Sequence, residues 1–115
     1  MSADARGDLL RLADILRACH QIQAYTIEGK AAFLDSEKTR DAVIRNFEVI
    51  GEAAGKLSLP LRTRNPGIEW SALRGFATFA KHEYWAIDLE RLWAAVEEIP
   101  TIERAVSKTR SAVED

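Results

Sequence analysis

The apolar residues in the first quarter of the chain recur at intervals of three and four positions. The stripe consists of Leu9, Leu12, Ile15, Leu16, Cys19 and Ile22. Because an α-helix has 3.6 residues per turn, this spacing places all six on one face. The pattern predicts an amphipathic helix over about residues 6–28 that ends near Gly29.

A second stripe follows Asp35 and Ser36, whose side chains can accept the first free backbone N–H groups of a helix. Its apolar positions are Val43, Phe47, Ile50, Ala54 and Leu57. Pro60 cannot continue a helix, so this pattern predicts that the second helix closes there. The Asn-Pro-Gly sequence at 65–67 then predicts a turn over Arg62 to Gly67.

The second half of the chain predicts further helices. The third runs over about residues 69–81, and its inward residues are Trp70, Leu73 and Phe76. Asp88 caps a fourth, whose apolar positions are Leu89, Leu92, Val96 and Ile99. Pro100 suits the first turn of a helix better than its middle, which predicts a break there and a last helix through Ile102 and Val106.

No segment alternates with the two-residue period of a strand. The sequence therefore predicts an all-α fold, an antiparallel four-helix bundle with a short fifth C-terminal helix. At 115 residues we expect one domain over residues 1–115.

Composition excludes several classes. No apolar run approaches the roughly 18 residues of a membrane span, and residues 1–6 carry no signal-peptide core, so we expect a cytoplasmic protein. Cys19 is the one cysteine and cannot form an internal disulfide, and its place in the first stripe predicts a buried thiol. No Cys/His cluster offers a metal site, so we expect no metal and no cofactor.

The net charge is −2, but the charges are unevenly distributed. Residues 56–81 carry one acidic residue, Glu69, against five basic ones, which are Lys56, Arg62, Arg64, Arg74 and Lys81. Such a local excess suits contact with nucleic-acid phosphates. A solvated loop that happens to be basic is the alternative.

The segment Leu73–Trp85 reads LRGFATFAKHEYW, with His82 followed two positions later by Tyr84. Three further blocks keep a fixed order around it. They are DAVIRNFEVIGEAA at 41–54, Pro66 with Ile68 and Trp70, and Ile87-Asp88 with Trp93. Together these blocks resemble the HEPN superfamily, and within it the HepT-like ribonuclease toxins that are paired with minimal nucleotidyltransferase antitoxins of the MntA type.

The resemblance implies metal-independent RNA cleavage in a cleft between two protomers. His82 occupies the position of the catalytic histidine, and imidazole in general suits proton transfer near neutral pH. The family carries an Arg five positions earlier, where this chain has Ala77, and Thr78 loosely fills the polar position that follows. Arg74 lies one turn before Ala77 and does not replace the missing Arg. We therefore expect this chain to be catalytically inactive, whether Ala77 is natural or engineered.

The resemblance also implies that the partner nucleotidyltransferase attaches AMP to Tyr84. The basic residues Arg62, Arg64, Arg74 and Lys81 are candidates for RNA binding. The apolar surface formed by Trp70, Phe76 and Phe79 predicts a homodimer through the third predicted helix.

Structural alternatives accompany each of these assignments. A histidine near a helix end often interacts with the helix dipole, and a tyrosine there often packs its ring. The whole chain has two alternatives as well: a non-catalytic helical dimer that binds a nucleotidyltransferase, and a plain helical bundle with an accidental likeness.

Overall fold

The computed structural model describes residues 1–115 as an all-α protein, which confirms the predicted fold class. Its four long helices are α1 (Ala3–Tyr25), α3 (Glu37–Gly55), α5 (Trp70–Lys81) and α7 (Leu89–Glu114). Three short helices lie between them: α2 (Lys30–Asp35), α4 (Leu59–Arg64) and α6 (Tyr84–Ile87). None of the seven helices is long and apolar enough to cross a membrane.

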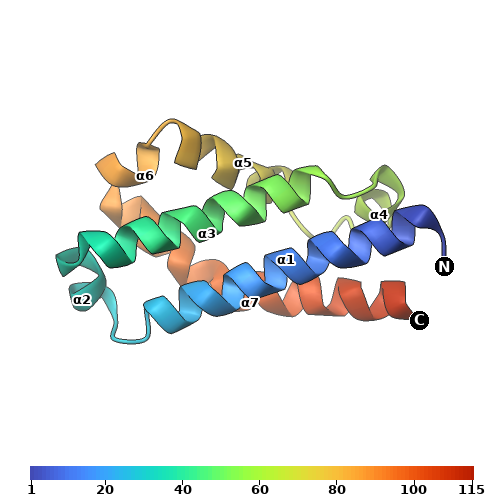
Figure 1. Ribbon diagram of the computed structural model, residues 1–115, viewed down its shortest axis with the longest axis horizontal. Helices are drawn as coiled ribbons and strands as arrows, with labels where there is room; N and C mark the ends of the chain where they lie inside the picture. Colours follow the sequence, from blue (N-terminus) through green and yellow to red (C-terminus); the bar gives the residue numbers. More distant parts are fainter.

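The long helices pack in the order α5, α3, α1, α7. Helix α3 lies between α1 and α5, and α7 packs on the other side of α1 (Figure 1). Both chain termini lie at one end of the molecule, together with α4, whereas α2 and α6 lie at the opposite end. Helices α5 and α7 make few contacts with each other, so the bundle stays open along that side.

Side-chain caps set the starts of the helices. Ser36 accepts the backbone N–H of Thr39 at 3.1 Å, and Asp88 accepts that of Arg91 at 3.0 Å. Both caps were predicted, because each side chain satisfies a donor that has no partner within its helix. Ser58, the N-cap residue of α4, also bonds to another helix. Its backbone N and its Oγ both donate to the buried carboxylate of Asp8 on α1.

The predicted break at Pro100 is wrong, and there is no separate fifth C-terminal helix. Pro100 lies inside the continuous helix α7. Proline removes one helical hydrogen bond, but Pro100 is exposed to solvent. Ile99 and Val106 on either side are fully buried, so packing against α1 keeps the helix in one piece.

The predicted end of the second helix also needs correction. Helix α3 ends at Gly55, and Pro60 occupies the first turn of α4, a position where its missing N–H costs nothing. The segment predicted as a turn from Arg62 begins as the last part of this short helix. Helices of four to six residues carry too little periodicity to be recognised in sequence, which explains why α2, α4 and α6 were missed.

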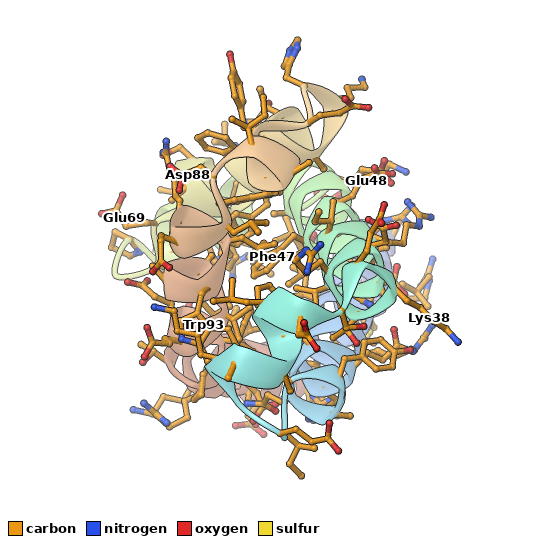
Figure 2. All side chains as sticks on the ribbon, turned by 90° about the vertical axis from the view of Figure 1, so that its left-hand side faces the viewer. Lys38, Phe47, Glu48, Glu69, Asp88 and Trp93 are labelled. Atoms are coloured by element: carbon orange, nitrogen blue, oxygen red, sulfur yellow. The ribbon has the colours of Figure 1, made fainter.

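The core has Phe47 at its centre, surrounded by the helices in the end view of Figure 2. Cys19 is fully buried, as predicted. Burial, and to a smaller extent the charge of Glu103, raise the pKa of the Cys19 thiol to about 12. Because the thiolate is the reactive form, this thiol is inert at neutral pH.

The tightest helix contact lies between α3 and α5, at Gly51 and Ala77. A Cβ atom built on Gly51 would lie 2.8 Å from Ala77 Cβ and closer still to the Ala77 backbone nitrogen. Ordinary Cβ contacts are never this short. The hydrogen side chain of Gly51 therefore sets how closely α5 approaches α3.

We expect Gly51→Ala to lower the free energy of unfolding by about 1–3 kcal/mol, because the added methyl group has to push α5 away from α3. Gly7→Ala is the matched control, since a Cβ there meets nothing within 4 Å. That variant should gain about 0.5–1 kcal/mol from helix propensity alone. Urea unfolding measures both changes, and equal stability of the two variants would contradict the contact.

Candidate functional site

The site predicted from the sequence lies where α5 ends and α6 begins. His82 is the C-cap residue of α5, and its backbone N–H donates to the carbonyl of Thr78 at 3.1 Å. Its side chain is exposed and takes part in none of the six ion pairs of the molecule. The imidazole is therefore free to meet a ligand from solvent.

A single backbone feature turns the chain between His82 and Tyr84. Glu83 adopts φ 59° and ψ 23°, the only left-handed conformation among the non-glycine residues. This conformation costs about 1–2 kcal/mol for a residue with a Cβ, and such strain clusters at functional sites. The turn brings the rings of His82 and Tyr84 to a centroid distance of 5.9 Å. The two motif side chains therefore lie together.

An aromatic cluster of Phe47, Phe76, Phe79 and Trp85 holds this turn in place. Trp85 is 2% exposed, and its ring centroid lies 5.0 Å from that of Phe79 and 5.8 Å from that of Phe47. Tyr84 makes an edge-to-face contact with Phe79, with ring centroids 5.4 Å apart, and is itself half exposed. The strained residue is thus flanked by an anchored ring and a packed ring, which explains how the fold tolerates it.

Ala77 does not project freely into the site. Its Cβ packs against Gly51 of α3, so this position lies at the helix contact described above. Thr78 is exposed on the same helix. No cationic side chain comes from position 77, where the resemblance implies an Arg.

The four basic candidates divide into two groups. Arg74 and Lys81 are exposed and seven residues apart on α5, which puts them on one face of the helix with Thr78 between them. Arg62 and Arg64 lie on α4, beyond the other end of α5, and Figure 1 shows α4 and α6 at opposite ends of the molecule. Lys81 directly precedes His82, whereas Arg74 lies eight residues before it, with its Nε near Gly55 at the end of α3. Arg62 and Arg64 lie at the other end of the molecule.

Two features of the site were not predicted. An apolar groove of about 760 Å³ runs between α5 and α7, along the open side of the bundle, and its walls include Ala72, Phe76, Phe79 and Ala95. Arg91 of α7 also lines it, with its guanidinium 4.2 Å from the centroid of Phe79. No sequence signal pointed to Arg91, because its partner ring lies on another helix.

No group of three His, Cys, Asp or Glu side chains that could hold a metal ion is found.

Comparison with known proteins matches residues 15–109 to the family model described as Ribonuclease HepT-like. The chain belongs to the HepT-like ribonuclease family. It is 34% identical over 101 residues to the "Probable ribonuclease HepT" of Thermococcus cleftensis, an alignment that covers 86% of this chain and 92% of that protein. A protein of Methanocaldococcus jannaschii that is named as an RNase is 32% identical over 97 residues, covering 83% of this chain and 89% of the relative. No solved structure matches the chain significantly.

Proposed function

We propose that this HepT-like chain is the toxin component of a toxin–antitoxin pair, built on a metal-independent endoribonuclease scaffold but catalytically silent because Ala77 replaces the motif Arg. The observation that carries the proposal is the exposed pair His82 and Tyr84, set side by side at the end of α5 with no cation at position 77. Family membership and the RNase names of the relatives support RNA as the substrate. RNA and ATP are both available in the cytoplasm, where we place the protein.

Cleavage of RNA without a metal needs a base for the ribose 2′-hydroxyl, an acid for the leaving 5′-oxygen and positive charge for the crowded phosphorus. The imidazole of His82 is exposed and suits the proton transfers. A guanidinium suits the charge, because its planar fork binds two phosphate oxygens at once. Loss of one such stabiliser commonly lowers the rate by about 10²–10³, so the Ala77 chain should be almost silent.

The exposed face of α5 supports an RNA-binding role for Arg74, Thr78 and Lys81. Arg74 and Lys81 are about 10 Å apart along the helix, given a rise of 1.5 Å per residue. Both can therefore contact neighbouring phosphates of one strand that ends at His82. Arg62 and Arg64 lie beyond the start of α5, a helix about 18 Å long whose other end carries His82, and we assign them to a more distant part of the strand.

The open groove between α5 and α7 supports a homodimer, and we propose that a second copy of this chain occupies its length along Ala72 and Ala95, leaving the end at Arg91 accessible. The groove is lined by ten hydrophobic residues among seventeen, and it continues through Phe79 to the exposed ring of Tyr84. Pairing through this surface would set two His82 side chains into one cleft. Trp70 has no part in it, contrary to the expectation from the sequence, because it is buried and its indole N–H donates to the Asn65 carbonyl at 3.0 Å.

We expect sedimentation at micromolar concentration to show a species of about twice 12.9 kDa. Ala72→Glu should shift it to monomer, because Ala72 is an exposed residue of the groove and a buried unpaired carboxylate is costly. Ala24→Glu makes the same change on α1, outside the groove, and should leave the dimer intact. A wild-type protein that sediments only at 12.9 kDa contradicts the proposal.

We expect Ala77→Arg to convert an inert chain into a ribonuclease with a gain of at least about 10²-fold. The products should carry a 2′,3′-cyclic phosphate and should form in the presence of EDTA. Adding His82→Ala to this variant should abolish cleavage again. Circular dichroism has to accompany the assay, because the Arg stem starts at the contact with Gly51. Robust His82-dependent cleavage by the unchanged chain would show that Ala77 is not inactivating.

Ala77 also favours a second candidate function, a non-catalytic helical dimer that serves as the docking partner of a nucleotidyltransferase. The two functions differ in one outcome. A folded Ala77→Arg variant that binds the nucleotidyltransferase but never cleaves RNA supports the binding module, whereas restored cleavage supports the toxin.

We expect the partner nucleotidyltransferase to transfer AMP from ATP to Tyr84. The phenolic oxygen attacks the α-phosphorus, an O–P bond forms, pyrophosphate leaves, and the phenolic proton passes to solvent. The added phosphodiester would lie beside His82 and repel RNA. Tyr25 is the built-in control, because it is 47% exposed against 51% for Tyr84. Peptide mapping should place AMP on Tyr84 and lose it in Tyr84→Phe, while modification of Tyr25 would refute the assignment.

A further inference from the structure

The structure places a cation over Phe79, three residues before His82, and this cation comes from neither position 77 nor α5. Arg91 lies in the first turn of α7, and its guanidinium carbon is 4.2 Å from the centroid of the Phe79 ring. A cation over an aromatic face is attracted by the ring quadrupole, which fixes the guanidinium above Phe79. Phe79 is also the ring on which Tyr84 packs, and Tyr84 in turn lies 5.9 Å from His82. Phe79 and Tyr84 therefore connect Arg91 to His82 through successive ring contacts.

None of the acidic side chains around Arg91 forms an ion pair with its guanidinium. Glu90, its neighbour in sequence, accepts Lys30 Nζ of α2 at 2.7 Å. Asp88 uses its carboxylate Oδ1 to cap the backbone N–H of Arg91 and not its guanidinium. Glu83 carries the turn but forms no ion pair, and no carboxylate lies within 4.0 Å of the Arg91 guanidinium. The guanidinium keeps its hydrogen-bond donors available for a ligand.

The end of the groove next to α6 carries a free cation. Trp85 lines this groove together with Arg91, but its indole N–H is shielded from solvent. The donors that a ligand in the groove can reach at this end are those of the exposed Arg91 guanidinium, which suit a ligand rich in acceptor oxygens. The groove carboxylates, Glu69 and Glu98, lie farther along its length. A phosphodiester fits this end best.

We propose that Arg91 binds a phosphodiester of the RNA strand beside His82 and Tyr84, and that it supplies there the positive charge that Ala77 does not. The inference rests on the proposed RNA-binding function and adds a residue to it. The planar fork of Arg91 can hold two oxygens of one phosphate while its face stays on Phe79. In this arrangement the chain can bind RNA firmly at the motif although it does not cleave it.

The test measures binding and not cleavage. The probe is a fluorescently labelled single-stranded uridine dodecamer with 2′-O-methyl groups, which lacks the attacking hydroxyl. Fluorescence anisotropy over a range of salt concentrations gives the affinity and the slope of log K against log salt. Each phosphate contact on a single strand contributes about 0.7 to that slope.

We expect Arg91→Gln and Arg91→Met to weaken binding about tenfold and to lower the slope by about 0.7. Arg91→Lys should keep the slope, because it keeps the charge. Arg110→Gln is the matched control, since it removes the same charge from the same helix about 28 Å away, and it should change neither value. Arg91 is exposed, so melting curves of the variants should stay within a few degrees of the wild type.

The outcomes separate the two proposals. If Lys81→Gln weakens binding but both uncharged Arg91 variants behave like Arg110→Gln, the role of Arg91 is overturned while the RNA-binding function stands. If the wild-type protein does not bind the dodecamer, both proposals fail. If both uncharged Arg91 variants lose affinity without any change in slope, Arg91 acts through packing on Phe79 and the proposed phosphate contact is wrong.

Discussion

The close approach of α5 to α3 is the constraint on which the rest of this molecule depends. Gly51 has no side chain, and the backbone of Ala77 occupies the space that a Cβ would need. Because α5 packs so closely on α3, Phe76 contacts Phe47 in the centre of the core, with ring centroids 4.8 Å apart. On its other side α5 makes few contacts with α7, and the groove lies between these two helices.

The ring of Phe79 connects the site to this packing of helices. Phe79 packs on Trp85 within the aromatic cluster, carries Tyr84 on its edge and lies beneath the guanidinium of Arg91. The motif turn, with its strained Glu83, is therefore held by packing that begins in the core. Position 77 has two roles that compete in this chain. It is a tight helix contact, and it is the position at which the resemblance implies a cation, so Ala77 serves the packing while the cation over Phe79 comes from α7.

Much of the fold was determined by the sequence alone, because the signals are local. The three- and four-residue spacing of apolar positions depends only on helical geometry, and it located all four long helices. The caps at Ser36 and Asp88 bond to their own helices, three residues away. Burial of Cys19 followed from its place in the first stripe. The order of His82 and Tyr84, with the flanking blocks, was enough to indicate the family, which the comparison confirms.

Other properties were decided only by the tertiary structure, because they depend on atoms distant in sequence. Packing of α7 against α1 keeps the helix intact at Pro100, against the local preference for a break. Trp70 is buried because it meets the core and the Asn65 carbonyl, and so it cannot serve a surface. Neither the left-handed turn at Glu83 nor the placement of Arg91 over Phe79 has a signature in the sequence. The sequence names the residues that belong to the motif, but only packing between helices determines which of their neighbours reach it.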